Sequence, residues 1–258
     1  MLIRWTVFLF GVVSYAIFFA TFLYAIGFVG GFGVPIAIDG PATGGVAAAL
    51  VIDGLLLTLF ALQHSVMARP FFKAWITRTI PTAAERSVYV LASSVAMLLM
   101  FWQWRPIGGV VWDVANPAGR MRLWALFAFG WGTVLATTFL INHFDLFGLR
   151  QVWLFLRGRP YTQLHFGTPG PYRHVRHPLY VGWLFAFWAT PTMTAAHLFF
   201  ALMTTAYILV AIRFEERDLE AAHGVDYAEY RRRVPMLIPR IGGGERAAVP
   251  AREAIRHG

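Results

Sequence analysis

The chain has 258 residues, of which 58% are hydrophobic and only 14% are charged. A soluble domain carries about 25% charged residues, so the expected solvent of this chain is a lipid bilayer. Its net charge of +9 comes from arginines beside apolar runs, which argues against nucleic-acid binding, and the absence of cysteine excludes disulfides and thiolate sites for metals or catalysis.

Four apolar segments are long enough to cross a hydrocarbon core, which takes about 20 helical residues. They are Trp5 to Val29, Val46 to Met67, Ser87 to Trp104 and Met121 to Ile141. The first follows Arg4 and superficially suits a signal peptide, but it shows no small-residue cleavage site, so we expect it to be retained. Residues 1–141 are therefore predicted to form a four-helix transmembrane region.

Positive charges in the connections predict how these spans are oriented. Gly30 to Gly45 contains no Lys or Arg, whereas Ala68 to Arg86 and Asn142 to Arg176 contain several. Because basic loops stay on the cytoplasmic side of a membrane, we expect the N-terminus and the two basic connections to face the cytoplasm.

The apolar region from Leu179 to Ile212 is expected to start and finish on that same side, because the segment after it is also rich in arginine. A helical hairpin satisfies this requirement, with its turn at Thr190 to Thr194 and arms of about 12 and 17 residues. Such arms are short for full spans. We therefore predict six membrane helices, the last two shallow, with five helices as the alternative.

The densest polar run beside a span is Gly167 to Tyr180. Pro178 suits the first turn of a helix, where its missing N–H costs nothing, and this places His177 at the N-cap. The free backbone donors of that turn, with Arg173 and Arg176 nearby, predict a seat for a carboxylate. Alternatively these residues are positive-inside anchors, an explanation that fits histidine less well because histidine is mostly neutral near pH 7.

Two adjacent carboxylates, Glu215 and Glu216, stand at the end of the second apolar arm. Carboxylates at a membrane boundary are costly unless they are paired or functional. The returning hairpin is expected to bring them close to Arg173, Arg176 and His177. They form either a salt-bridge clamp across the hairpin base or part of a reactive site, and the two roles are compatible.

A helix is predicted to break at Gly224 and to resume with Tyr227 and Tyr230 on one face, before an apolar strip from Val234 to Pro239. Such a segment can fold back over the hairpin as a lid, whereas residues 241–258, with their run of glycines, are predicted to be a flexible tail. The predicted fold class is all-α: a polytopic transmembrane helical bundle with a C-terminal helical hairpin and a cytoplasmic helical lid.

Together these motifs resemble the C-terminal signature of the isoprenylcysteine carboxyl methyltransferase-like superfamily, which includes the phospholipid N-methyltransferases. The signature consists of Gly170 to Arg173, Arg176 to Gly182, Glu215-Glu216, and Tyr227 to Pro239. In that superfamily S-adenosylmethionine binds between the hairpin and the C-terminal segment, which agrees with the absence of a Rossmann glycine fingerprint here. The resemblance implies a cofactor-binding methyltransferase core in residues 142–240, without a metal ligand. The implied cofactor residues are Tyr172, Arg176, His177, Pro178, Tyr180, Gly182, Glu215 and Glu216, with the separate roles of the two glutamates left open.

Further segments are similar to the bacterial methanethiol S-methyltransferases of the nurim-like branch. They are Ser14-Tyr15 with Phe18-Phe19, Ala61 to Arg69, and Ile141 to Gln151, so that the resemblance extends from Phe8 to Pro239. It implies an enzyme of the bacterial inner membrane, with its site toward the cytoplasm, that uses S-adenosylmethionine to convert methanethiol to dimethyl sulfide and S-adenosylhomocysteine. Its implied partners are the small volatile thiol and the lipid bilayer, without nucleic acid or an obligate protein partner.

Two histidines at predicted cytoplasmic ends of spans are candidates for the base that accepts the thiol proton. One is His64, beside Gln63, and the other is His143, which Asp145 would orient if the fourth helix ends near Asn142. Either histidine could instead cap a helix end. The chamber around so small an acceptor is expected to be tight, apolar and aromatic.

Two other functions remain open at this stage. A lipid or prenylcysteine acceptor would need a lateral opening between helices, which a sequence does not show. A non-catalytic membrane protein, as the resemblance to nurim permits, would be expected to have lost the cofactor signature, whereas Arg176 to Gly182 and both glutamates are present here.

Overall fold

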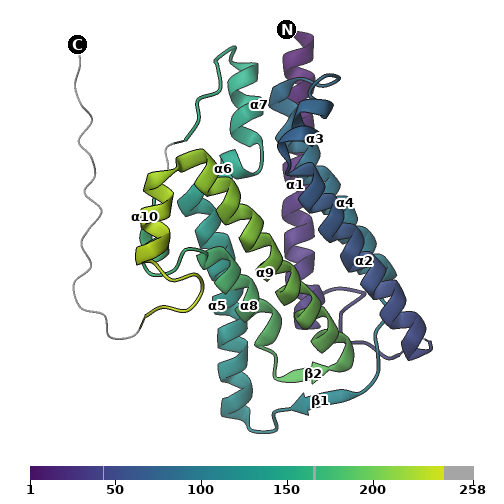
Figure 1. Ribbon diagram of the computed structural model, residues 1–258. Helices are drawn as coiled ribbons and strands as arrows, with labels where there is room; N and C mark the ends of the chain where they lie inside the picture. Colours follow the sequence, from purple (N-terminus) through teal and green to yellow (C-terminus); the bar gives the residue numbers. More distant parts are fainter. Residues whose placement is uncertain (43, 165–166, 241–258) are drawn as a thin grey trace.

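The computed structural model describes residues 1–42, 44–164 and 167–240, so the predicted tail of residues 241–258 lies outside the described residues. The chain forms a bundle of helices with a small two-stranded sheet at one end (Figure 1). The helices are α1 (Leu2–Gly30), α2 (Val46–Met67), α3 (Pro70–Ile76), α4 (Glu85–Gln103), α5 (Pro117–Ile141), α6 (His143–Leu146), α7 (Leu149–Leu156), α8 (Pro178–Trp188), α9 (Ala195–His223) and α10 (Val225–Arg233). The strands are β1 (Val110–Asp113) and β2 (Thr192–Thr194), and short 3-10 turns occur at Thr82–Ala84 and Gly170–Arg173.

Within the described residues, five helices are long and apolar enough to cross a membrane, namely α1, α2, α4 with the turn before it, α5 and α9. Large apolar side chains remain on their outer faces, for example Leu55 (65% exposed), Phe129 (54%) and Leu202 (52%). Such surfaces are unsuited to water but suited to lipid. The all-α polytopic bundle is thus confirmed, and the four spans predicted before residue 142 correspond to α1, α2, α4 and α5.

The C-terminal hairpin is asymmetric. α8 has 11 residues and is about 16 Å long, whereas α9 has 29 residues and is about 43 Å long. The prediction of two shallow arms is therefore wrong for the second arm, which is the fifth span. α9 does not stop where the apolar run ends at Ile212, because charged residues continue its backbone hydrogen bonding until Gly224, with φ 54°, ends the helix.

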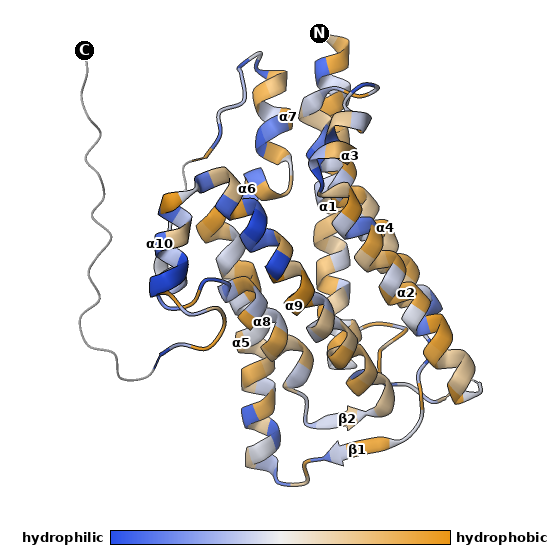
Figure 2. Cartoon of the chain, viewed as in Figure 1, coloured by the Kyte–Doolittle hydropathy of each residue, from blue (hydrophilic) through white to orange (hydrophobic). Residues whose placement is uncertain are grey.

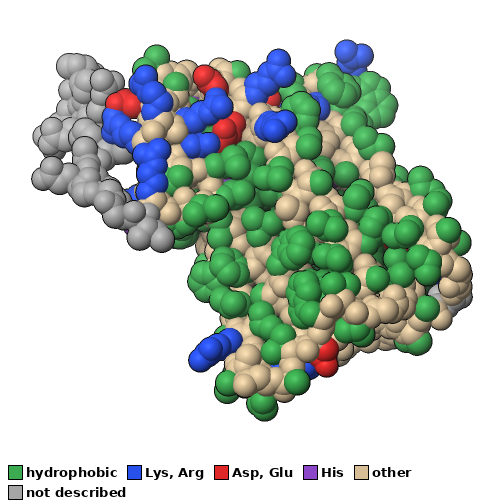
Figure 3. Space-filling model, turned by 60° about the horizontal axis from the view of Figure 1, so that its bottom comes forward, with side chains coloured by type: hydrophobic (Ala, Val, Ile, Leu, Met, Phe, Trp, Pro, Cys, Tyr) green, Lys and Arg blue, Asp and Glu red, His purple; other side chains and the backbone are tan. Residues whose placement is uncertain are grey.

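Charged side chains are distributed unequally between the two ends of the bundle. The end that carries α3, α7 and α10, called here the charged end, is the more hydrophilic one (Figures 1 and 2). Basic and acidic side chains gather on one part of the surface, and apolar side chains cover most of the rest (Figure 3). The opposite end, called the hairpin-turn end, carries β1 and β2, which pair antiparallel with Val110 opposite Thr194 and Asp113 opposite Thr192.

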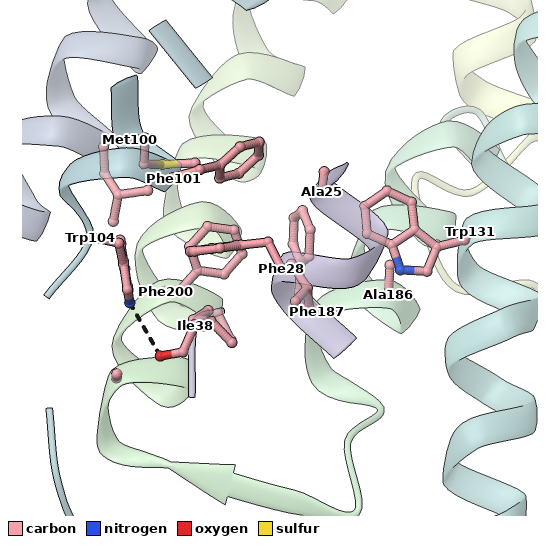
Figure 4. Packing of buried hydrophobic residues seen from close by; sticks show 14 of the residues in the cluster. Ala25, Phe28, Ile38, Met100, Phe101, Trp104, Trp131, Ala186, Phe187 and Phe200 are labelled. Carbon is pink, nitrogen blue, oxygen red and sulfur yellow. Dashed lines mark hydrogen bonds between the residues drawn. The ribbon is translucent and has the colours of Figure 1, made fainter. Parts of the chain in front are cut away.

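Aromatic rings from α1, α4, α8 and α9 form the core toward the hairpin-turn end (Figure 4). Phe28 packs against Phe101 with ring centroids 4.7 Å apart, and Phe187 packs edge-to-face against Phe200 at 5.0 Å. The Trp104 indole N–H donates to the carbonyl of Ile38 at 3.2 Å and so ties the connection after α1 to α4. In a membrane the hydrophobic effect provides little drive for helices to associate, so the packing of these large rings helps to hold the helices together.

Two glycines allow α5 and α8 to pack closely. A Cβ atom on Gly182 would lie 2.9 Å from the carbonyl oxygen of Gly130, and one on Gly130 would lie 2.5 Å from the backbone nitrogen of Ala186. Small residues let helix backbones approach in a membrane, where apolar burial offers little drive. This contact positions α8, and with it the polar residues at its start.

Candidate active site

At the charged end, a carboxylate of α9 joins the start of α8 to α10. Glu216 is only 6% exposed, and its Oε1 accepts hydrogen bonds from Arg176 Nε at 2.7 Å and His177 Nε2 at 3.0 Å. Its Oε2 lies 3.3 Å from Arg231 Nε. The prediction that His177 is the N-cap of α8 and Pro178 its first residue is confirmed. The buried carboxylate thus has the paired cations and hydrogen bonds that make its burial tolerable.

The apolar strip after α10 folds back onto the segment that leads into α8. The backbone N–H of Arg176 donates to the carbonyl of Pro235 at 2.9 Å, and that of His177 donates to Met236 at 3.2 Å. The Arg176 guanidinium also donates to the carbonyl of Val234 at 2.6 Å, and Met236 packs against the hydrophobic core. The lid predicted from the sequence is therefore formed, and Arg176 ties it to Glu216.

The neighbouring carboxylate is in a different situation. The Glu215 side chain is 45% exposed; among the described residues it forms no ion pair with arginine or lysine, and His177 Nδ1 lies 3.7 Å away. The phenols of Tyr172 and Tyr180 interact with it electrostatically. Burial and the charge of Glu215 raise the pKa of Tyr172, so its phenol stays a neutral hydrogen-bond donor. Glu216 therefore holds the arginine, whereas Glu215 lies half-exposed beside the two phenols.

α10 places two tyrosines against this cluster. The Tyr230 hydroxyl donates to the carbonyl of Tyr172 at 2.7 Å. The Tyr227 ring is 1% exposed, and burial raises the pKa of Tyr227 to about 12, with the charge of Glu216 acting in the same direction. The face that these tyrosines share, predicted from their spacing, is thus the face that covers the site.

Two of the predicted cofactor residues lie apart from the accessible part of this cluster. Gly182 faces α5, where its missing side chain permits the close helix contact, and Pro178 is fully buried in the first turn of α8. These contacts show a packing role for both residues, and their expected place in a cofactor pocket stays a prediction. The other predicted residues, which the structure does bring together, are Tyr172, Arg176, His177, Tyr180, Glu215 and Glu216.

The histidine after α5 has partners other than the predicted one. His143 Nε2 lies 2.8 Å from the Tyr15 hydroxyl, and its Nδ1 lies 2.8 Å from the Thr138 hydroxyl. Thr138 donates its own proton to the carbonyl of Leu135, so it accepts from Nδ1 and leaves Nε2 to accept from Tyr15. The ring is 2% exposed, and this burial lowers the pKa of His143. The predicted pairing of His143 with Asp145 is not formed.

Asp145 binds an arginine instead. Its Oδ1 accepts from Arg150 at 2.8 Å and its Oδ2 accepts from the Tyr161 hydroxyl at 3.2 Å. α5 does end at Ile141, as the prediction required, and Asn142 takes the left-handed conformation with φ 110°. Residues two apart in the turn that follows point in different directions, however, so Asp145 turns toward α7 while the histidine turns inward.

The other predicted base, His64, lies in a polar cluster between α2 and α4. The Tyr89 hydroxyl is 2.8 Å from Nε2 and 3.0 Å from Nδ1, and Ser93 Oγ is 3.3 Å from Nδ1. Tyr207 of α9 approaches the same region through Ser65, at 3.2 Å between hydroxyl oxygens. Sequence reasoning missed these hydroxyls, because single tyrosines and serines in apolar spans carry no motif. They become recognisable as a cluster only when α2, α4 and α9 are packed together.

Known proteins with similar sequences are methyltransferases and nurim. Residues 121–224 match the family described as Phospholipid methyltransferase. The chain is 57% identical to a methanethiol S-methyltransferase of Crocosphaera subtropica, over 93% of this chain and 94% of that protein. It is 56% identical to one of Mycobacterium tuberculosis, over 92% and 97%, and 31% identical to nurim of Mus musculus, over 67% and 69%. No solved structure matches the chain.

A bundle of membrane-crossing helices whose α5-to-α9 region matches a methyltransferase family defines the class of the protein, a membrane methyltransferase. The matched region leaves out α1, α2 and α4, whereas the similarity to the bacterial proteins covers nearly the whole length. The chain belongs to the methanethiol S-methyltransferase family.

Proposed function

We propose that the chain methylates methanethiol with S-adenosylmethionine, giving dimethyl sulfide and S-adenosylhomocysteine. The observation that carries this proposal is the 57% identity, over 93% of the chain, with a protein named methanethiol S-methyltransferase. That similarity includes α1, α2 and α4, which lie outside the segment shared with the phospholipid family and would enclose the acceptor.

The residues at the charged end fit S-adenosylmethionine, which carries an ammonium group, a carboxylate, ribose hydroxyls and an adenine. Glu215, half-exposed and without an arginine partner among the described residues, would hold the ammonium or the ribose hydroxyls, beside the phenols of Tyr172 and Tyr180. The backbone N–H groups of Leu179 and Tyr180, in the first turn of α8, lack acceptors within the helix and suit a carboxylate. When bound, the cofactor supplies a methyl group already activated on a sulfonium.

The remaining residues of the site would hold this arrangement and keep water out. Glu216 fixes Arg176 and His177 at the start of α8, and Arg176 ties down the strip after α10. Methyl transfer to a thiolate is an in-line displacement, so the protein contributes mainly by aligning the reactants and excluding solvent. A clamp and a lid meet these two requirements.

The acceptor must lose its proton, because the thiolate rather than the thiol is the nucleophile. His64 and His143 remain the candidates for accepting that proton, each through or beside a tyrosine. Asp145, which binds Arg150, has no part in this step. A small apolar thiol is expected to sit in a chamber lined mainly by aromatic side chains.

We further propose that the protein lies in the bacterial inner membrane with its charged end in the cytoplasm. The basic connections 68–86 and 142–176 lie at that end, whereas the connection between α1 and α2, at the hairpin-turn end, has no Lys or Arg (Figure 1). The positive-inside rule supports this orientation. The bilayer and the thiol are then the partners of the chain.

An acceptor assay tests the reaction directly. The purified protein, in lipid nanodiscs, is given S-adenosylmethionine with a labelled methyl group and one of three acceptors: methanethiol, phosphatidylethanolamine or a prenylated cysteine. We expect label in dimethyl sulfide, measured by gas chromatography. Label in the lipid instead, which the match to the Phospholipid methyltransferase family would favour, would contradict the proposed acceptor.

Binding of S-adenosylhomocysteine tests the donor side separately. Calorimetric titration into the nanodisc-embedded protein is expected to show saturable binding at one site per chain. A protein that takes up no S-adenosylhomocysteine and methylates none of the three acceptors would be a non-catalytic membrane protein.

A further inference from the structure

Polar side chains gather inside the bundle, between α2, α4 and α9, on the membrane side of Glu215 and Glu216. The cluster consists of Gln63, His64, Ser65, Tyr89, Ser93 and Tyr207, all partly buried and all in membrane-crossing helices. Polar groups at membrane depth are costly, and they mark substrate paths more often than they mark simple packing. We refer to these six residues as the inner polar cluster.

Tyr180 connects the inner polar cluster to the cofactor residues. Its phenol, in the first turn of α8, interacts electrostatically with Glu215 and also with the phenols of Tyr89 and Tyr207. On α9, Tyr207 stands about 12 Å before Glu215, or roughly two helical turns deeper in the bundle. The inner polar cluster therefore adjoins the carboxylate assigned to the cofactor, on its membrane side.

The other tyrosine–histidine pair, Tyr15 and His143, has no contact with Glu215 or Glu216 in the described part of the chain. The rings of Phe139, Phe144 and Phe147 pack against His143, and Phe139 stacks on the imidazole at 4.2 Å. Burial alone accounts for the lowered pKa of His143, so no charged group of the described site acts on it. Both nitrogens of its ring are occupied by Tyr15 and a threonine. This pair fastens α1 to the turn after α5.

The hydrogen bonds within the inner polar cluster orient the His64 ring. Ser93 accepts from the Gln63 amide at 3.3 Å and can also accept from His64 Nδ1 at 3.3 Å. In that tautomer Nε2 carries the lone pair, and the Tyr89 hydroxyl donates to it at 2.8 Å. Phe60 stacks on the imidazole at 5.2 Å, which holds the ring in this orientation.

The inner polar cluster retains an unused acceptor. Gln63 Oε1 is buried and has no hydrogen-bond partner among the described residues. A buried polar atom without a partner costs stability, so Gln63 Oε1 is an acceptor that a bound molecule would satisfy.

We propose that Tyr89 contacts the thiol and that Tyr89 and His64 together take its proton, whereas the Tyr15–His143 pair is structural. This inference rests on the proposed function. The S–H bond breaks as its proton passes to the Tyr89 oxygen, while the phenol proton passes to Nε2 of His64. The electron pair left on sulfur forms the bond to the transferred methyl carbon, and the pair of the broken C–S bond stays on the sulfur of the donor. His64 then returns its proton to solvent.

The groups around Tyr89 and His64 favour a developing thiolate. The cations Arg86, in α4, and Arg69, at the start of α3, act on Tyr89, and Glu85 is the acidic group that acts on it. From α8 and α9 the facing groups are the phenols of Tyr180 and Tyr207, which are uncharged donors. Arg69 is itself paired with Asp218 at 2.9 Å, so Arg86 is the cation that mainly favours negative charge on Tyr89 and on a thiolate beside it.

Tyr89→Phe and Tyr15→Phe form a matched pair, since each removes one hydroxyl that is bonded to a histidine. We expect kcat/KM for methanethiol to fall about 100-fold in Tyr89→Phe, the usual size of a lost acid–base group, and less than about threefold in Tyr15→Phe. S-adenosylhomocysteine affinity should stay within about twofold of wild type in both, which shows that the variants are folded and that only the acceptor side has changed.

A pH profile separates proton transfer from packing. Free methanethiol ionises as pH rises, so the rate of Tyr89→Phe is expected to recover about tenfold per pH unit, more steeply than that of wild type. His64→Gln should show the same profile, and a more acidic small thiol such as trifluoroethanethiol should narrow both deficits. Ser93→Ala, which removes the acceptor shared by His64 Nδ1 and the Gln63 amide but leaves Tyr89 in place, is expected to give a smaller loss of the same kind and serves if Tyr89→Phe does not fold.

An active wild type with an unaffected Tyr89→Phe, or a larger loss in Tyr15→Phe, would overturn the inference alone. A wild type that forms no dimethyl sulfide would overturn the proposed function, and this inference with it.

Discussion

At each end of the bundle a buried histidine binds a carboxylate, and among the described residues the charged end has a second carboxylate beside the pair. At the hairpin-turn end, Asp39 accepts from His197 Nδ1 at 3.1 Å and from the Thr194 hydroxyl. At the charged end, Glu216 binds its arginine and histidine in the same manner, and Glu215 stands next to it with 45% of its side chain exposed.

This difference distinguishes a network that only holds helices together from one that leaves a polar group exposed to a ligand. His197 is 1% exposed, and its Nε2 donates to the carbonyl of Phe187 at 2.9 Å, so both ring nitrogens are occupied by protein atoms. Such a network holds α9 to α8 and to the connection after α1. A binding site needs polar atoms that the protein leaves available, and a histidine–carboxylate pair by itself therefore does not identify one.

Removing the arginine of the clamp is expected to have the largest effect. Arg176→Ala leaves Glu216 buried with only a weaker cation, Arg231, and breaking a buried ion pair costs about 3–5 kcal/mol. We expect the free energy of unfolding in detergent micelles to fall by about 3 kcal/mol, measured by denaturant titration. The control is Arg217→Ala, which removes an exposed arginine next to Glu216 in α9. An equal loss of unfolding free energy in the two variants would show that the Arg176–Glu216 ion pair does not stabilise the fold.

Breaking the hydrogen bonds of His197 at the hairpin-turn end should destabilise the protein without changing cofactor binding at the charged end. His197→Ala removes two buried hydrogen bonds and leaves Asp39 partly unpaired, so the free energy of unfolding is expected to fall by about 2 kcal/mol. S-adenosylhomocysteine affinity, measured by calorimetry where the variant is folded, should stay within about twofold. A larger change would show that the two ends are not independent.

Substituting Glu215 is expected to lower the affinity for the cofactor product while leaving the stability of the protein nearly unchanged. Glu215→Gln removes a charge that the described protein does not pair with an arginine, so stability should change by less than about 0.5 kcal/mol. The affinity for S-adenosylhomocysteine is expected to fall about tenfold, the value of one hydrogen bond to a charged group. Asp218→Asn, three residues further along α9 in a surface ion pair with Arg69, should leave the affinity unchanged.

The smallest effect is expected at the exposed edge of the two-stranded sheet. Hydrogen bonds from Thr192 and Arg120 lower the pKa of Asp113 below its unfolded value of about 3.9. The stabilisation is therefore present above about pH 4 and is lost as pH falls through the lowered folded pKa. Thermal unfolding of Asp113→Asn and wild type should differ slightly near pH 6 and converge on acidification. Divergence on acidification would contradict the assignment.

The spans and their ends followed from features local to the chain. Apolar length predicted α1, α2, α4 and α5, and Pro178 and Gly224 predicted where α8 begins and where α9 ends. These features act within a few residues, so a single sequence contains them. Hydropathy alone placed the end of the second membrane arm at Ile212, because it marks where a helix leaves the bilayer, whereas the hydrogen bonds of α9 continue to the break at Gly224.

The site was predictable as a set of residues but not as an arrangement. The signature located Arg176, His177, Glu215 and Glu216, and the structure brings all four together. A signature read along one helix does not show which way each residue faces, however. It did not show, for example, that Gly182 packs against α5.

By itself, the sequence determined that this is an all-helical membrane protein with a polar site where a short helix starts and a long helix ends. Apolar length, helix-breaking residues and charge act on their own neighbours in the chain, so they are readable without a fold. Only the tertiary structure decided that Glu216 binds the arginine while Glu215 remains available, that Asp145 turns away from its histidine, and that Tyr89 meets His64. Each of these depends on how one helix is rotated and placed against another, which packing across the whole bundle sets.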